Sequence, residues 1–368
     1  MSRQNREELL DLLFFSTALR YAVVGPRHSR GNSALTWKLD THVETRHSSY
    51  HYQVITMKLS GIIPPMITPL RSRTELDSDG TRRLVDHLID GGVSGLFLLG
   101  TTSEGPSLSY QLRYELVETV CEHVGGRIPV LVGVTDTSLT EALHLCEHAS
   151  ACKATAVVAA APFYFPVPVA QMEEYFIALA DQSPLPVVLY NMPSCTNIEM
   201  SMASCHRLAQ HQNIVGMKDS SGDLDYFKRL CNELKSDDFS VLIGPEEKLH
   251  TAVDLGSDGG VCGGANLFPH LYVQLYRAAV RDDADRVQQL SSLVQRVVEK
   301  LYFPDGKHMN IMGALKYCLS QSDICSEQIL LPLMPVANKD RDNLRNELLE
   351  IDREISRALD TGRVVAHD

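Results

Sequence analysis

The chain has 368 residues, 44% hydrophobic and 22% charged, which is the composition of an ordinary globular protein. Its formal net charge of −12 argues against a basic nucleic-acid footprint and a polybasic membrane surface. No apolar run approaches the roughly 20 residues that span a bilayer, and the nine cysteines occur singly, without a CxxC pair. We therefore expect a cytoplasmic protein with reduced thiols that binds neither nucleic acid nor membrane.

Residues 1–57 differ from the remainder of the chain. They carry basic and histidine-rich stretches at 27–30 and 47–51, and Met57 opens the segment just before the first clear strand. The apolar stretch at 9–15 follows acidic residues and lacks a small-residue cleavage site, so it does not read as a signal peptide. We expect 1–57 to be an N-terminal extension that is disordered or not natively translated.

From residue 61 onward, short apolar runs alternate with longer amphipathic segments. The runs predict eight strands, at 61–68, 95–100, 129–134, 155–161, 186–191, 214–218, 240–244 and 259–265. The amphipathic segments predict eight helices, at 79–91, 109–124, 138–152, 169–182, 200–210, 222–235, 247–255 and 268–280.

This alternation predicts an α/β fold with a parallel sheet, and its length suits a (β/α)₈ TIM barrel over 58–281. Further helices at 282–303, 306–320 and 340–359 predict a C-terminal helical appendage over 282–368. An open doubly wound sheet is the alternative, but it would usually show GxGxxG after its first strand. Here the first strand contains Pro64 and Pro65, which fit poorly in a central strand, and no such motif follows.

Lys218 ends the apolar run 214–217, where a barrel builds its active site, at the C-terminal ends of its strands. Burial disfavours the charged ammonium form of a lysine, and a neutral, desolvated amine forms Schiff bases with carbonyl compounds. The structural alternative is a lysine whose stem lies along the strand while its ammonium group reaches water.

Groups that would assist such an amine stand at other predicted strand ends. The Tyr190 phenol could move protons, and the turn Gly100-Thr101-Thr102 offers hydroxyl and N–H groups for a substrate carboxylate. Taken alone, Tyr190 could be a core tyrosine and the turn could merely cap the next segment. Their joint appearance with Lys218 at predicted strand ends favours a catalytic role over a purely structural one.

Two other patterns point elsewhere. His144 and His148 have the i, i+4 spacing of a metal site, but they fall inside a predicted helix, away from the strand ends, which favours a solvated face. The glycine-rich run 259–264 could cradle a phosphate or, at Gly263, leave room for a ligand. We expect no metal and no cofactor.

Four motifs occur in order: Gly100-Thr101-Thr102-Ser103-Glu104-Gly105, Tyr190-Asn191-Met192-Pro193, Gly216-Met217-Lys218-Asp219 and Gly263-Gly264-Ala265-Asn266. With them, the stretch from about 61 to 300 resembles the dihydrodipicolinate synthase / N-acetylneuraminate lyase family of pyruvate-dependent aldolases. The resemblance implies a TIM barrel, usually tetrameric, in which Lys218 forms an imine with pyruvate and Tyr190 transfers protons. It further implies that Thr101 relays protons, that Thr102 helps to hold the pyruvate carboxylate, and that Tyr164 completes the relay from a neighbouring subunit.

Departures from the family pattern bear on the second substrate. Cys195 stands where dihydrodipicolinate synthases carry an arginine that grips the second substrate's carboxylate, and a thiol cannot make that contact. Ser103 replaces a glycine, a mild change. The site for feedback inhibition by lysine is also altered, at Tyr110, Arg113, Thr137 and Phe163, while Glu141 matches.

We therefore expect a class I aldolase or lyase that acts on pyruvate or another 2-oxo acid. Its partner aldehyde would come from a 2-oxo sugar acid or a hydroxy-oxo acid, and the enzyme would be a homo-oligomer, a tetramer or dimer. Two alternatives remain open. One is 4-hydroxy-tetrahydrodipicolinate synthase, which condenses pyruvate with aspartate semialdehyde. The other is a non-catalytic oxo-acid-binding protein on the same fold.

Overall fold

The computed structural model describes residues 58–303 and 310–359, which all belong to one unit, Gln53–Asp368. The expectation for residues 1–57 lies outside the described residues.

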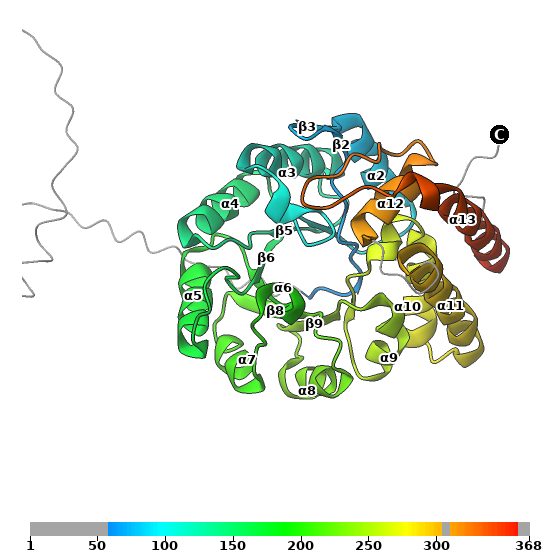
Figure 1. The fold of residues 1–368 in the computed structure, drawn as a ribbon. Helices are drawn as coiled ribbons and strands as arrows, with labels where there is room; N and C mark the ends of the chain where they lie inside the picture. Colours follow the sequence, from blue (N-terminus) through cyan, green and yellow to red (C-terminus); the bar gives the residue numbers. More distant parts are fainter. Residues whose placement is uncertain (1–57, 304–309, 360–368) are drawn as a thin grey trace, which may run out of the picture. The chain divides into compact units, whose positions relative to one another are not determined.

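Eight parallel strands form one sheet in the order β1-β10-β9-β8-β7-β6-β5-β4. The strands are β1 (Gly61–Ile62), β4 (Leu96–Leu98), β5 (Val130–Gly133), β6 (Ala156–Ala160), β7 (Val187–Asn191), β8 (Ile214–Asp219), β9 (Ser240–Ile243) and β10 (Gly259–Gly260). The sheet curls into a closed barrel. Its two edges are joined where Met66 N donates to Phe97 O and Phe97 N donates to Pro64 O, both at 2.9 Å. The predicted TIM barrel is confirmed, with the strands inside a ring of helices (Figure 1).

The ring contains α2 (Ser78–Asp90), α3 (Tyr110–Val124), α4 (Leu139–Ala151), α5 (Val169–Gln182), α7 (Met202–Leu208), α8 (Leu224–Leu234), α9 (Leu249–Asp254) and α10 (Pro269–Val280). Several of these helices begin at the short polar side chains that the sequence offers as N-caps. Ser109 accepts from Leu112 N at 3.3 Å, and Asp223 accepts from Tyr226 N at 3.0 Å.

The first strand differs from its prediction. β1 ends at Ile62 instead of continuing to residue 68, because Pro64 and Pro65 have no N–H to donate to a ladder. The structure also adds a short antiparallel hairpin, β2 (Leu70–Ser72) with β3 (Glu75–Leu76), and a short helix, α6 (Pro193–Thr196).

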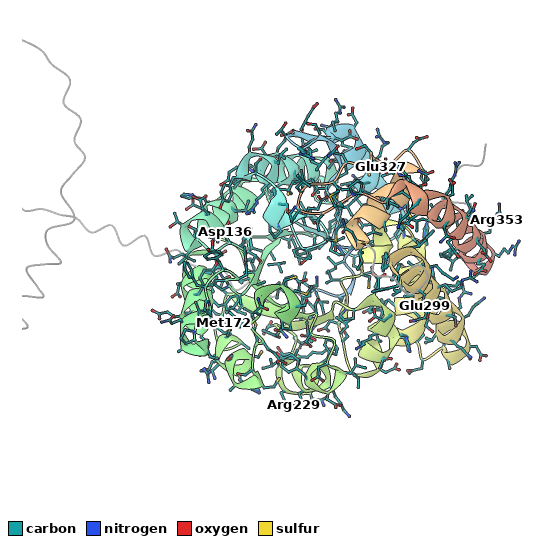
Figure 2. The ribbon with its side chains drawn as sticks, in the orientation of Figure 1. Asp136, Met172, Arg229, Glu299, Glu327 and Arg353 are labelled. Carbon is teal, nitrogen blue, oxygen red and sulfur yellow. The ribbon has the colours of Figure 1, made fainter. Side chains whose placement is uncertain are left out.

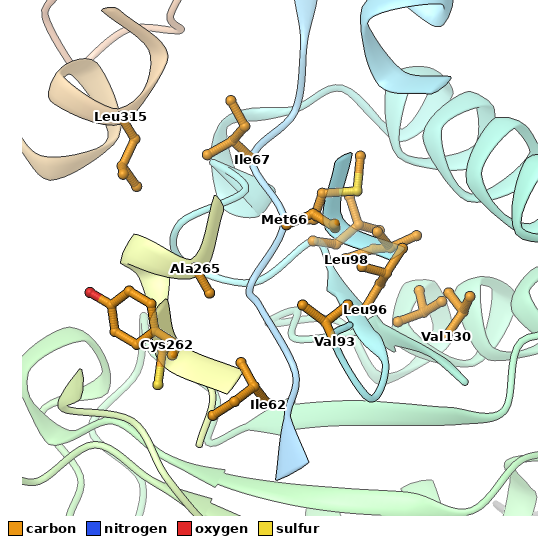
Figure 3. Close-up of a cluster of buried hydrophobic side chains, with 14 of the residues drawn as sticks. Ile62, Met66, Ile67, Val93, Leu96, Leu98, Val130, Cys262, Ala265 and Leu315 are labelled. Atoms are coloured by element: carbon orange, nitrogen blue, oxygen red, sulfur yellow. The ribbon is translucent and has the colours of Figure 1, made fainter. Parts of the chain in front are cut away.

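Buried apolar side chains form two clusters. The larger cluster lies between the sheet and the helices and extends into the C-terminal region, where Leu315 lies near Ile67 and Ala265 (Figure 3). The smaller cluster fills the barrel interior and contains Phe97 and Tyr190. Both faces of the strands are therefore buried, which explains why their sequences are continuous apolar runs.

The C-terminal region consists of α11 (Ala284–Val297), a π-helical turn η4 (Val298–Tyr302), α12 (Ile311–Ser320) and α13 (Asn338–Leu359). Its buried leucines belong to the larger core cluster, whereas charged side chains such as Arg353 lie at the outer surface (Figure 2). In the ranges that the structure describes, no helix is long and apolar enough to cross a membrane.

Candidate active site

Lys218 lies near the C-terminal end of β8 and is only 5% exposed. Its Nζ is 4.1 Å from the centroid of the Tyr190 ring and 5.2 Å from that of Phe97. The centroids of the two rings are 6.3 Å apart in an edge-to-face arrangement, so both aromatic rings lie over the amine inside the barrel.

A β-bulge in β8 turns the Lys218 side chain toward this position. Val187 pairs with Ile214 but Val188 pairs with Gly216, so Val215 is an extra residue in β8. Val215 belongs to the interior cluster, and the bulge turns Met217 outward and Lys218 inward. Val215 and Lys218 therefore both face the barrel interior although they are three residues apart, whereas strict alternation would place them on opposite faces.

The ends of β7 and β8 are fastened to each other beside the amine. Asn191 Nδ2 donates to Asp219 Oδ1 at 2.7 Å, and Ser221 Oγ donates to Asp219 Oδ2 at 2.9 Å. Burial raises the pKa of the Asp219 carboxyl, while these two hydrogen bonds act in the opposite direction. The register that aligns Tyr190 with Lys218 is thereby fixed.

The turn after β4 brings Thr101 to Tyr190, with 3.4 Å between the two hydroxyl oxygens. Leu99 and Glu104 both have φ of 57°, in the left-handed region. A side chain at Gly105 would place Cβ 2.2 Å from Leu99 O, so only glycine allows the turn to close this tightly.

Ser103 ties the same turn to the segment that follows β1. Its hydroxyl donates to Met66 O at 2.5 Å, and its carbonyl accepts from Thr68 Oγ1 at 2.7 Å. Thr102 is partly buried between Thr101 and Ser103. The serine that replaces the family glycine is thus held inside the turn.

A cavity of about 240 Å³ opens beside Tyr190. Its wall combines apolar and hydroxyl-bearing residues: Phe97, Leu99, Gly100, Thr101, Gly105, Pro106, Arg113, Gly133, Thr135, Ala160, Phe163, Tyr190, Met192, Cys195 and Thr196. Lys218 lies behind Phe97 and Tyr190 and is not a wall residue. A molecule in the cavity would reach the amine past these two rings.

The structure brings five of the eight predicted site residues together. Gly100, Thr101, Tyr190 and Cys195 line the cavity, and Lys218 lies against the Tyr190 ring. Cys195 is an exposed wall residue on α6, a helix that sequence analysis did not predict.

The other three, Thr102, Tyr164 and Gly263, do not line the cavity, although Thr102 follows Thr101 in the turn. Tyr164 is 74% exposed, with its ring against that of Phe165 at 5.1 Å, while its neighbour Phe163 lines the cavity. Gly263 begins the 3-10 turn η3 (Gly263–Asn266) after β10, where a Cβ would lie 3.4 Å from Glu246 Oε2.

Glu246 is a buried carboxylate that sequence analysis did not single out, although it follows a predicted strand end. It accepts from Gly264 N and from the Tyr272 hydroxyl, both at 2.7 Å. Burial raises the pKa of the Glu246 carboxyl, against the lowering effect of these hydrogen bonds.

This raised pKa predicts a pH-dependent stability. Between the unfolded and folded pKa values the folded protein binds more protons, so its free energy of unfolding should fall as pH rises through that interval. Relative to Glu246→Gln, the wild type should gain stability as pH is lowered from about 8 to 5. Urea denaturation across this range would measure the difference, with Glu122→Gln on the exposed face of α3 as control. A difference that stays constant with pH would contradict the raised pKa.

Arg113 differs from the family residue expected at the site for feedback inhibition by lysine, and in the structure it lines the cavity. Its guanidinium lies 3.3 Å from Asp136 Oδ2, which also accepts from the Tyr110 hydroxyl at 2.9 Å. The cation in this part of the wall is therefore already paired.

His144 and His148 lie on α4, away from the cavity. His144 contacts Glu141 at 3.7 Å, and His148 Nε2 lies 3.2 Å from Tyr114 O. Across residues 58–303 and 310–359, no group of three or more His, Cys, Asp or Glu side chains is arranged to hold a metal ion.

The chain matches the model of the dihydrodipicolinate synthetase family over residues 58–351. It is 38% identical over 224 residues to the probable 2-dehydro-3-deoxy-D-pentonate aldolase YjhH of Escherichia coli, covering 60% of this chain and 74% of that protein. The structure of dihydrodipicolinate synthase from Bacteroides thetaiotaomicron matches with a TM-score of 0.76 and 41% identity, covering 79% of this chain and 98% of that one. YagE of Escherichia coli, solved in complex with pyruvate, matches with a TM-score of 0.75 and 29% identity, covering 80% of this chain and 98% of that one. The chain therefore belongs to the dihydrodipicolinate synthetase family.

Proposed function

We propose that this protein is a class I aldolase or lyase in which Lys218 forms a Schiff base with pyruvate or a related 2-oxo acid. The observation that carries the proposal is the Lys218 amine, buried at the catalytic end of the barrel 4.1 Å from the Tyr190 ring, whose hydroxyl lies 3.4 Å from Thr101 Oγ1. An enclosed amine beside a pair of proton-carrying hydroxyls has the composition that imine chemistry needs.

In the condensing direction, the neutral Lys218 amine attacks the 2-oxo carbon of pyruvate, and water leaves to give the imine. A proton then leaves the methyl group, and the resulting enamine adds its carbon to the aldehyde, whose oxygen takes up a proton. Water hydrolyses the imine and returns the amine, and cleavage follows the same steps in reverse. Tyr190 transfers the protons, and Thr101 relays them.

The remaining site residues hold the substrate. Thr102 and the backbone of the turn at Gly100 bind the pyruvate carboxylate through hydroxyl and N–H groups. Gly263 leaves space for the ligand because it has no side chain. Tyr164 completes the proton relay in a neighbouring subunit, and its 74% exposure supports a surface that a second copy covers in a homotetramer or dimer.

Cys195 favours a 2-oxo sugar acid or hydroxy-oxo acid as the aldol partner, because the thiol offers no positive charge to a second carboxylate. The likeness to YjhH, named a probable 2-dehydro-3-deoxy-D-pentonate aldolase, supports the same choice. The second candidate is 4-hydroxy-tetrahydrodipicolinate synthase, which the 41% identity to the Bacteroides synthase favours.

We also propose a cytoplasmic location, since all nine cysteines are free thiols.

A substrate screen tests these assignments. Purified protein would be incubated with 2-oxo-3-deoxy sugar acids and with hydroxy-oxo acids, and pyruvate release would be measured. We expect release from at least one member of these classes and little turnover of pyruvate with aspartate semialdehyde. Robust turnover of the semialdehyde would instead support the synthase, and no turnover of any substrate would support an oxo-acid-binding protein.

A further inference from the structure

A buried ion pair joins the turn after β4, which carries Thr101, to the C-terminal helices. The Glu104 carboxylate contacts the Lys316 ammonium group, and both side chains have 0% exposure. Glu104 closes the turn that carries Thr101 and Thr102, whereas Lys316 lies on α12, far along the chain. The pair therefore links the site to a part of the protein outside the barrel.

Each partner is also fastened to the segment that follows α12. Glu104 Oε2 accepts from Leu330 N at 2.7 Å, and Lys316 Nζ donates to Gln328 O at 2.7 Å. Burial lowers the pKa of the Lys316 ammonium, and the neighbouring Glu104 carboxylate opposes this shift. The four groups form one connected polar cluster in an otherwise apolar region.

Stability alone does not account for such a pair. Taking two charges out of water costs about as much as their attraction returns, and apolar replacements of similar volume are often as stable. The location of Glu104 suggests another role. Its backbone is held at φ 57°, at the end of the turn whose other end is Leu99, also at 57°. Between these two fixed points lies Thr101, whose hydroxyl faces Tyr190 and which lines the cavity.

We propose that Glu104 and Lys316 are positioning residues for the imine-forming site. Lys316 holds the Glu104 carboxylate, Glu104 holds the turn in its left-handed conformation, and the turn keeps Thr101 Oγ1 at 3.4 Å from the Tyr190 hydroxyl. The inference rests on the proposed function, because it concerns the proton relay of that reaction. It also gives the C-terminal helices a part in catalysis.

The test uses the full-length protein and the double variant Glu104→Gln/Lys316→Met. This variant removes both charges at nearly constant volume, and the amide oxygen that replaces the carboxylate can still accept from Leu330 N, so we expect a melting temperature near that of the wild type. Because the ionic link is lost, kcat should fall on the order of 10-fold or more, the usual consequence of a small misplacement at a reacting group. The rate of borohydride trapping with pyruvate should fall in parallel.

A thermodynamic cycle separates positioning from a merely structural role. In a Thr101→Val background the relay is already lost, so adding the double variant should lower kcat little further. Tyr317→Phe serves as control, since it removes a hydrogen bond from α12 to Arg341 O at 3.2 Å without touching the turn or the polar cluster. Its kcat should equal that of the wild type.

Several outcomes would overturn the inference. A folded double variant with wild-type kcat would do so, as would full additivity with Thr101→Val. If the double variant does not fold, Glu104→Asp keeps both charges but shortens the link by one methylene, and wild-type kcat in that variant would equally overturn it. Failure of the proposed function is distinguishable, because the wild-type protein itself would then trap no pyruvate on Lys218.

Discussion

Replacing Lys218 with alanine should abolish turnover. In the proposed mechanism the amine forms the covalent bond with the 2-oxo carbon, and removal of a covalent nucleophile lowers kcat on the order of 10⁴-fold or more. The other buried lysine described above, Lys316, cannot substitute, because it is held by Glu104 and Gln328 O in the polar cluster. Pyruvate release from the active substrate of the screen would measure the loss.

Borohydride reduction in the presence of pyruvate identifies the amine directly. The reduced adduct should appear by mass spectrometry on Lys218 of the wild type and should be absent from Lys218→Ala. Lys218→Arg tests whether a positive charge suffices, since a guanidinium stays protonated and forms no imine under these conditions. It should be as inactive as the alanine variant. Retained turnover in either variant, or an unmodified Lys218 in active wild type, would rule out the mechanism.

The barrel was predictable because its strands are buried on both faces. Each of the eight predicted runs overlaps a strand, and most helix boundaries agree within two residues, because caps such as Ser109 and Asp223 mark the starts. The hairpin formed by β2 and β3 was missed, because strands this short carry no alternating pattern. The helix predicted at 282–303 divides into α11 and the π-helical turn η4. No local sequence pattern predicts this division.

The grouping of the candidate site residues was predictable to the extent that these residues follow strand ends. Lys218, Tyr190 and the turn at Gly100 each stand directly after or at the end of an apolar run, so the barrel topology brings them together. The bulge at Val215 was not predictable, because it depends on how β8 pairs with β7. The pair of Glu104 with Lys316 likewise depends on a tertiary contact between distant segments, which one sequence does not reveal.

Replacing Tyr190 with phenylalanine should slow catalysis by roughly 10²-fold or more, if its hydroxyl is the general acid and base. The substitution keeps the ring that covers the Lys218 amine at 4.1 Å and removes only the oxygen that faces Thr101. Pyruvate should therefore still bind with little change in KM. The loss should appear in kcat and in the rate of borohydride trapping, because imine formation needs the same proton transfers.

Tyr276→Phe is the matched control for this prediction. The Tyr276 hydroxyl donates to Asp258 O at 2.9 Å, before β10 and away from the strand ends that carry the site. Its loss should cost about 1 kcal/mol of stability, the net value of one hydrogen bond, and should leave kcat unchanged. Wild-type kcat in Tyr190→Phe would contradict the assignment. The proton would then have to travel by another route, with Thr101 as the next hydroxyl to replace, because it is the group in contact with the Tyr190 oxygen.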